Sequence, residues 1–308
     1  MDAAVLHEPG APRFGTVDDP TADDENQAVV EVTAAGLNPV DLMIAGGRQP
    51  DELPLVPGLE GVGWHQRRHV YFNGARPPHG SMAQRTIVDH SGVFDLPDDL
   101  DDGVAVALGI AGLAAWLSLS WRAALQPGET VLVLGATGVL GTIAVQAAKL
   151  QGAGQVVAAG RDADGLRTAA GRGADATVDL TTTDDPTAAF RDAAGGDLDV
   201  IVDPLWGEPA LAALRAAGPF ARLVQIGSSA ASEITLSPDV FRTNCAAILG
   251  YTTRAVPIET QREAYATMTA YAADGDLTVD VERVPLRDVA SAWQRQADSA
   301  HRKLVLVP

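Results

Sequence analysis

The amino-acid sequence predicts an α/β protein in which a doubly wound parallel sheet is joined to a second part built from short strands. Three observations lead to this prediction. Residues 130–150 have the pattern of a strand, a glycine-rich turn and a helix. Strand-like and helix-like segments then alternate as far as residue 251. Residues 1–100 instead contain short alternating runs that are broken by glycine, proline and aspartate.

The segment Thr130–Leu150 is the clearest element of the chain. Its apolar run, Val131–Leu134, is typical of a strand that is buried on both faces of a parallel sheet. Three glycines follow at three-residue spacing; they permit a tight turn, close approach of the backbone to a pyrophosphate, and close packing of helix and strand. The helix N-terminus adds unpaired amide groups and a partial positive charge. We therefore expect dinucleotide binding, with a purely structural turn as the alternative, and the expected contacts are Gly135, Ala136, Thr137, Gly138, Val139, Leu140 and Gly141.

Composition excludes several classes of partner. The net charge of −18 and the pI near 4.5 argue against nucleic acid and against an anionic membrane surface. A single cysteine, Cys245, excludes an internal disulfide and a cysteine-rich zinc site. Asp2 and Glu8 stand where a signal peptide has basic and apolar residues, so we expect a cytoplasmic protein.

One segment, Gly103–Trp121, contains no charged residue and is long enough to cross a bilayer. It consists mostly of alanine, glycine, serine and leucine, and it lies between segments of ordinary polarity. We expect a buried helix here and no membrane partner.

The first hundred residues predict a small β-barrel or sandwich. Residues 29–34 and 85–88 alternate between apolar and polar side chains, and glycine- and proline-containing turns separate such runs. The helical pattern then extends to residue 124, and the turn at residues 126–129 leads into the first strand of the parallel sheet.

The middle of the chain predicts a repeated strand–helix alternation, which is typical of a doubly wound parallel sheet. After the first strand and helix, the expected strands are residues 156–159, 176–179, 200–203, 222–226 and 247–251, and the expected helices are 164–172, 186–194 and 209–217.

The end of the chain resembles the first part more than the second. A helix over residues 259–273 is followed by an alternating run at 279–284, a helix at 289–297 and a strand at 303–307. We expect this tail to fold back onto the first part.

Several segments, in this order along the chain, are similar to medium-chain dehydrogenase/reductases of the zinc-independent quinone oxidoreductase branch. The resemblance implies a GroES-like β-barrel domain formed by residues 1–121 and 253–308, and a Rossmann domain formed by residues 122–252. It also implies a homodimer. The segments that carry it are residues 36–41, 57–63, 69–71, 80–84, 112–116, the glycine turn, 227–228 and 303–306.

Two related classes fit the sequence less well. Short-chain reductases carry a similar glycine motif at the chain start together with a Tyr-x-x-x-Lys pair, but here the motif begins at residue 135 and no tyrosine precedes a lysine by four. Zinc alcohol dehydrogenases need thiolate and imidazole ligands, and Asn38 and Glu60 stand in the corresponding segments. His65 and His69 are four apart but lie in a predicted strand and loop, so no metal is expected.

The coenzyme is expected to be NADP(H). The second strand of the parallel sheet ends in Gly160 and Arg161, at the position where an NAD-specific protein has an acidic residue for the ribose 2′-hydroxyl. A guanidinium there can form charge-assisted hydrogen bonds with a 2′-phosphate. The nearby Asp162 and Asp164 weaken this argument, and an ordinary surface arginine is the alternative.

The resemblance assigns the remaining site residues. Asn38 is the expected catalytic residue, which donates to the substrate oxygen or to the cofactor ribose, and an asparagine-stabilised turn at Asn38-Pro39 is the alternative. Asp41 is expected to hold the same loop. Residues that follow strand ends are expected along the nicotinamide, although Tyr251 also fits a dimer seam; they are Leu205, Ile226, Gly227, Ser228, Tyr251 and Thr252.

These residues imply hydride transfer to a quinone or an α,β-unsaturated carbonyl. Two departures from the family pattern bear on turnover: Gln49-Pro50 stands near the usual position of a tyrosine, and Ala114 replaces a threonine. A nucleotide-binding redox sensor or interaction protein with little turnover is therefore the second hypothesis. The sequence leaves open whether Arg48 and Arg67 face solvent or select a polar substrate.

Overall fold

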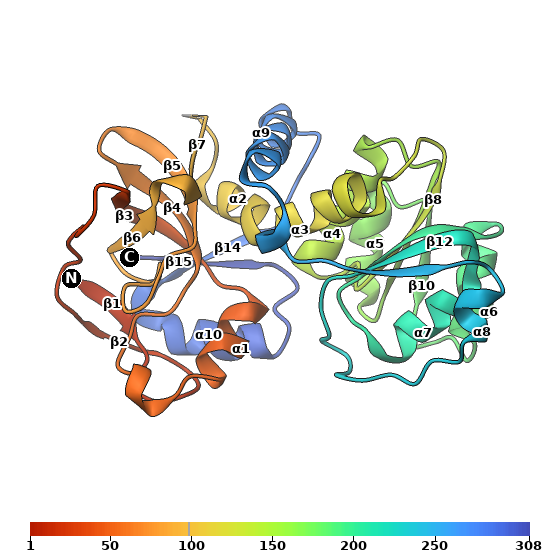
Figure 1. The fold of residues 1–308 in the computed structure, drawn as a ribbon, viewed down its shortest axis with the longest axis horizontal. Helices are drawn as coiled ribbons and strands as arrows, with labels where there is room; N and C mark the ends of the chain where they lie inside the picture. Colours follow the sequence, from red (N-terminus) through yellow and green to blue (C-terminus); the bar gives the residue numbers. More distant parts are fainter. Residues whose placement is uncertain (98) are drawn as a thin grey trace. The chain divides into compact units, whose positions relative to one another are not determined.

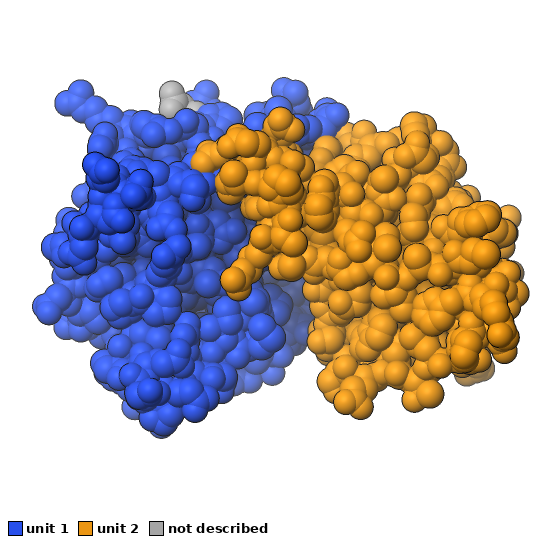
Figure 2. Space-filling model, viewed as in Figure 1, with its two compact units in different colours: residues 1–110, 265–308 blue, residues 111–264 orange. Residues whose placement is uncertain are grey.

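The computed structural model describes residues 1–97 and 99–308. The chain forms two compact units, one made of residues 1–110 and 265–308 and the other of residues 111–264 (Figure 2). Helix α9 (Ile258–Asp274) contributes residues to both units. The domain boundaries expected from the sequence, at 121/122 and 252/253, stay a prediction.

The unit of residues 111–264 contains a parallel sheet, of which β8, β10 and β12 are labelled in Figure 1. The sheet has six strands in the order β10-β9-β8-β11-β12-β13. Numbered within this unit, the order is 3-2-1-4-5-6, the doubly wound arrangement that binds dinucleotides. The α/β fold class with a Rossmann sheet is therefore confirmed. Its strands are β8 (Thr130–Leu134), β9 (Gln155–Gly160), β10 (Ala176–Asp179), β11 (Leu198–Asp203), β12 (Ala217–Gln225) and β13 (Ala247–Gly250).

Helices cover both faces of this sheet, as a doubly wound fold requires. The first strand is fully buried over Val131–Leu134, which explains the continuous apolar run in the sequence. Helix α3 packs beside α4, and α6 packs beside α7. The helices are α3 (Leu113–Leu117), α4 (Val139–Leu150), α5 (Ala163–Gly171), α6 (Pro186–Ala194), α7 (Gly207–Ala216) and α8 (Asp239–Arg242).

The unit of residues 1–110 and 265–308 is the GroES-like part of the fold. A seven-stranded sheet has the order β14-β15-β3-β4-β5-β7, with β6 paired to β3, and β1 and β2 form a separate hairpin. Strand β15 pairs antiparallel with β3, which is the return of the tail that the sequence predicts. The strands are β1 (Asp2–Val5), β2 (Arg13–Thr16), β3 (Gln27–Gly36), β4 (Glu60–His65), β5 (Arg68–Asn73), β6 (Arg85–Asp89), β7 (Val93–Asp95), β14 (Val281–Pro285) and β15 (Lys303–Val307). The helices are α1 (Pro39–Gly46), α2 (Asp102–Ala107) and α10 (Val289–Ala297).

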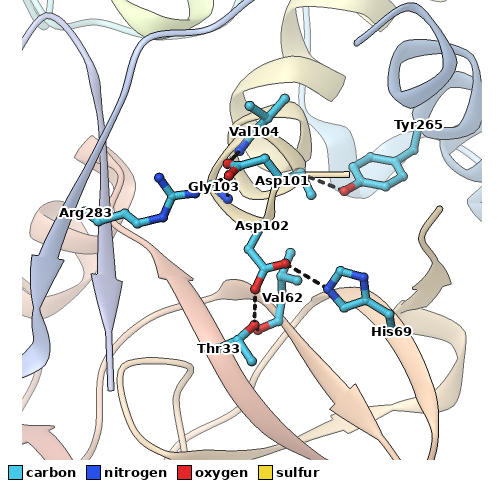
Figure 3. A network of polar contacts seen from close by, with 10 residues as sticks. Thr33, Val62, His69, Asp101, Asp102, Gly103, Val104, Tyr265 and Arg283 are labelled. Carbon is cyan, nitrogen blue, oxygen red and sulfur yellow. Dashed lines mark hydrogen bonds and ion pairs between the residues drawn. The ribbon is translucent and has the colours of Figure 1, made fainter. Parts of the chain in front are cut away.

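Polar contacts fix the start of α2 against the sheet of this unit (Figure 3). Asp101 caps the helix by accepting its first amide groups, and it pairs with Arg283 on β14. Asp102 accepts the hydroxyl of Thr33 on β3 and lies 2.9 Å from Nε2 of His69 on β5. Helix α2 is therefore tied to three strands.

One helical segment, Asp102–Ala123, is long and apolar enough to cross a membrane by length and composition. It joins α2 and α3 through a π-helical turn at residues 108–112 and ends in another at 118–123. Of its most apolar window, 83% is buried, as in a helix of a protein core.

Candidate nucleotide-binding site and the buried network of Asn38

The glycine turn joins β8 to α4 at the carboxyl edge of the parallel sheet. Gly135 has φ +62°, a left-handed conformation that favours glycine. A Cβ at Gly141 would stand 2.6 Å from Ala136 Cα, so the close packing of helix and turn requires glycine there as well. Gly138 is different: its Cβ would be 3.5 Å from the nearest atom, the carbonyl oxygen of Gly135. The position is therefore open toward the space in front of α4, where a phosphate is expected to bind.

The strand order reverses between β8 and β11, and ligands of such sheets bind in the crevice at this point. Gly135 follows β8 and Leu205 follows β11. A Cβ at Gly135 would lie 3.1 Å from Leu205 Cδ2, which brings these two predicted cofactor residues side by side. Thr137 is buried between Gly160 and Gly165, since a Cβ at either glycine would stand 2.7 Å from its side chain.

Arg161, on which the NADP(H) prediction rests, directly follows β9 (Gln155–Gly160). Arg161 is exposed and has no ion pair within residues 1–97 and 99–308. Asp162 caps α5 through hydrogen bonds of 3.2 Å from the amides of Asp164 and Gly165, and Asp164 pairs with Arg167. Both acidic neighbours of Arg161 thus have partners on α5.

The loops after β11 and β12 are joined by backbone hydrogen bonds. The amide of Ile226 donates to the Asp203 carbonyl at 2.8 Å, and a Cβ at Gly227 would lie 2.9 Å from the Pro204 carbonyl oxygen. The next residue, Ser228, is exposed. Ile226 and Gly227 therefore lie beside the first residues of the loop that contains Leu205.

Tyr251 and Thr252 follow β13, which is separated from β8 by β11 and β12 in the sheet. They line an open hollow of about 470 Å³ together with Trp121 and Arg122. The Tyr251 hydroxyl donates to the Leu113 carbonyl at 3.2 Å, and burial raises its pKa to about 12. The hydroxyl is neutral at physiological pH, and it already donates its proton in the hydrogen bond to the Leu113 carbonyl.

Asn38, the predicted catalytic residue, belongs to a buried polar network in the other unit. Its Oδ1 accepts a hydrogen bond from Lys303 Nζ at 2.7 Å, and its Nδ2 donates to Glu60 Oε1 at 2.8 Å and to Asp41 Oδ2 at 3.4 Å. Lys303 also lies 2.7 Å from Glu60 Oε1. The whole carboxamide of Asn38 is therefore engaged by protein groups.

Glu60 stands at the centre of this network. Its Oε2 accepts the hydroxyl of Tyr71 at 2.9 Å and the amide of Ile110 at 2.6 Å. A Cβ at Gly109 would overlap both Glu60 and Tyr71, and the helical backbone is interrupted at that glycine. Burial raises the pKa of Tyr71 well above its usual range, so the phenol donates and stays neutral.

Asp41 is the weakly satisfied member of the network. Its Oδ2 accepts the Asn38 amide at 2.8 Å, whereas Oδ1 is buried without a partner among the described residues. Burial raises its pKa to about 7. Asp41 and Arg48 line a cavity of about 30 Å³, which has room for one or two water molecules. Arg48 also pairs with Glu52 at 2.7 Å, while Arg67 is exposed.

Comparisons with known proteins agree with this arrangement. Residues 139–270 match the family described as zinc-binding dehydrogenase. The crystal structure of a quinone oxidoreductase from Thermus thermophilus, also determined in complex with NADPH, aligns over 100% of both chains with a TM-score of 0.85 and 27% identity. The chain is therefore similar to the medium-chain dehydrogenase/reductases, and among them to the quinone oxidoreductase-like proteins.

Curated relatives of this family match over part of their length. A quinone oxidoreductase-like protein 2 from Bos taurus is 27% identical over 208 residues, which are 64% of this chain and 60% of the bovine protein. A quinone oxidoreductase from Lama guanicoe is 33% identical over 138 residues, which are 41% of this chain and 42% of the llama protein.

Although the matching family is described as zinc-binding, the two histidines considered from the sequence have other contacts. His65 Nδ1 lies 3.0 Å from the Val29 carbonyl, and His69 contacts Asp102. Within the described ranges, no group of three or more His, Cys, Asp or Glu residues is placed to hold a metal ion.

Sequence reasoning does not assign three residues that the structure brings into these sites. In the sequence, Lys303 is only part of a closing motif, and Glu60 only a replacement for a zinc ligand. Asp203 is only a strand end there, yet it is fully buried at the crevice. The available signal is the charge itself, because a lysine and a glutamate inside apolar strands have to be paired.

Proposed function

We propose that this medium-chain reductase is an NADPH-dependent oxidoreductase that transfers hydride to a quinone or an α,β-unsaturated carbonyl without zinc. One observation supports the proposal most strongly. The Gly135–Gly141 turn lies at the reversal point of a 3-2-1-4-5-6 parallel sheet, and Gly138 leaves the start of α4 accessible to a phosphate.

The preference for NADPH in this proposal rests on Arg161. Its exposed guanidinium follows β9, and the two neighbouring carboxylates are engaged with the α5 amides and with Arg167. A guanidinium can bind a phosphate through two parallel hydrogen bonds, whereas an NADH ribose offers it no charge.

In the proposed reaction, the nicotinamide supplies the hydride and the protein supplies binding and orientation. Leu205, Ile226 and Gly227, which follow β11 and β12, are the residues expected to lie along the nicotinamide. Asn38 is the proposed donor to the substrate oxygen. Its longer hydrogen bond, 3.4 Å to Asp41, is the one that it can exchange at the lowest cost.

The zinc-free part of the proposal is supported by the charge of the Asn38 network. Lys303 Nζ lies 2.7 Å from both Asn38 Oδ1 and Glu60 Oε1, so an ammonium already stands where a bound cation would need these oxygens. The proposal also includes a cytoplasmic homodimer. Strand β13 lies at the edge of its sheet, and an edge of this kind can pair with a second copy.

A nucleotide-binding sensor with little turnover is the second candidate. Two features favour it: Ala114 offers no hydroxyl, and Asn38 has no side-chain hydrogen-bonding group that is not already engaged. Both candidates share the glycine turn, so binding alone does not separate them.

Fluorescence titration with NADPH and NADH, followed by addition of a small quinone and an enone, tests the proposal. Tighter binding of NADPH with consumption of the reduced nicotinamide is the expected result. Binding without consumption across the panel would favour the sensor, and absence of binding by either nucleotide would overturn both.

A further inference from the structure

The carboxylate of Asp203 is buried at the carboxyl end of β11, next to the reversal point of the sheet. Its side chain is 0% exposed, whereas carboxylates are almost never fully buried unless they have partners. Oδ1 accepts the backbone amides of Leu205 and Trp206 at 2.9 and 2.8 Å. Oδ2 has no partner among the described residues. The hydrogen bonds of this side chain are therefore directed at the loop that follows the strand.

That loop has a strained backbone. Trp206 has φ +60° and ψ −164°, a region that residues with side chains rarely adopt. Such a conformation persists only where surrounding contacts stabilise it. Here the two hydrogen bonds from the Leu205 and Trp206 amides to Asp203 Oδ1 stabilise it. Gly207 follows with φ +72° and begins α7.

The same loop contacts two other segments of its unit, the glycine turn and the segment after β12. Leu205 and Pro204 lie within 3.1 and 3.3 Å of the position of a Cβ at Gly135. The Ala230 amide donates to the Leu205 carbonyl at 2.8 Å. The loop over residues 204–206 therefore connects the glycine turn with the segment after β12.

We infer that Asp203 is a positioning residue for nucleotide binding, which sets the loop of residues 204–206 against the glycine turn. The inference rests on the proposed function and adds to it a residue outside the expected contacts. Asp203 acts through the backbone of Leu205 and Trp206 and does not itself touch the nucleotide.

The chain contains a matched control on the same strand. Asp199 lies at the amino end of β11, and its Oδ2 accepts the amide of Thr130 at 2.8 Å. Both aspartates thus accept backbone amides, but Asp199 does so at the opposite edge of the sheet. Loss of either should lower stability, and only loss of Asp203 should alter nucleotide affinity.

The experiment measures the Kd of NADPH and the thermal unfolding of the wild-type protein and of Asp203→Ala, Asp203→Asn and Asp199→Ala. The asparagine variant keeps an Oδ1 acceptor for the two amides. We expect a Kd at least about tenfold higher for Asp203→Ala, and a change of less than about threefold for Asp203→Asn and Asp199→Ala. If Asp203→Ala does not unfold cooperatively, Asp203→Val, which likewise has no side-chain acceptor for the two amides, is measured in its place with the same expectation.

Two results would overturn the inference while the proposed function stands: equal affinity of wild type and Asp203→Ala, or equal weakening by Asp203→Ala and Asp199→Ala. A wild-type protein that binds neither NADPH nor NADH would instead overturn the proposed function, and this inference with it.

Discussion

Lys303 and Glu60 form a buried ion pair, with Nζ of Lys303 2.7 Å from Oε1 of Glu60 and side-chain exposures of 1% and 0%. Two charges can leave water together only if their remaining hydrogen-bonding groups are satisfied. Asn38 forms hydrogen bonds with both members of the pair. The Tyr71 hydroxyl and the Ile110 amide donate hydrogen bonds to the other carboxylate oxygen of Glu60. This ion pair and its hydrogen bonds therefore join β15, β4 and the start of α1.

Removal of one charge from this pair should be costly. We expect Lys303→Met to lower the free energy of unfolding by about 3–5 kcal/mol, because Glu60 then stays buried without a counter-charge. Chemical denaturation measures this loss. The double variant Lys303→Met, Glu60→Gln should recover a large part of it, since it leaves no unpaired charge.

The only other lysine provides the control. Lys149 pairs with Asp175 at 2.5 Å, and these side chains are 30% and 41% exposed. Lys149→Met should cost about 1 kcal/mol or less because water screens the pair. Equal losses for the two lysine variants would contradict the description of Lys303 as buried and paired.

The role of Asn38 can be separated from its structural contacts. Asn38→Ala removes the proposed donor and should lower kcat by about 10²–10³-fold, the usual effect of losing one oxyanion donor. Lys303→Met disturbs the same network but keeps the donor, so it should lower kcat far less. Steady-state kinetics with a quinone compares the two variants. Equal kcat losses would show that Asn38 acts only through the network.

Local patterns in the sequence are sufficient to predict the parallel sheet. Val131–Leu134 is apolar throughout because both of its faces are buried, and a buried strand tolerates no alternation. Helices α6 and α10 have the bounds that the sequence predicts, because the helical pattern of side chains starts and stops clearly at both ends of each segment.

The buried network cannot be predicted in the same way. Asn38 and Lys303 are 265 residues apart, and Glu60 and Lys303 are 243 apart. No local pattern reports which charges meet across a sheet; only the pairing of β15 with β3 and of β3 with β4 brings them together. The engagement of the Asn38 carboxamide is for that reason invisible in the sequence.

Coenzyme preference should depend on Arg161. We expect Arg161→Ala to raise the Kd of NADPH by about 10- to 100-fold, since a hydrogen bond to a charged group contributes roughly 1.5–3 kcal/mol. The Kd of NADH should hardly change. Arg215→Ala, which removes an exposed arginine from the last turn of α7, serves as control. Parallel titrations of both nucleotides decide the matter, and an unchanged ratio of the two affinities in Arg161→Ala would assign the coenzyme preference to other residues.

Stability should depend on pH through Asp203. Burial raises its pKa to about 6, from a usual value near 3.8. The stabilisation that its protonated form provides is complete below pH 3.8 and is lost as the pH rises through 6. Asp203→Asn does not titrate, so its stability relative to wild type should rise by on the order of 1 kcal/mol between pH 5 and pH 7.5.

Denaturation of both proteins across that pH range measures the difference. A constant offset between wild type and Asp203→Asn would mean that the carboxyl group titrates in the folded protein as it does in the unfolded chain.

The variant Gly138→Ala tests whether the Gly135–Gly141 turn binds a dinucleotide. A Cβ at Gly138 would be 3.5 Å from the nearest atom, an ordinary contact, so the variant should fold and melt like wild type. The same Cβ would occupy the approach of the pyrophosphate. We predict saturable NADPH binding by wild type, weakened about tenfold or more in Gly138→Ala at unchanged thermal stability. Equal NADPH affinity of the two proteins, or no binding by wild type, would contradict the assignment of this turn as the nucleotide site.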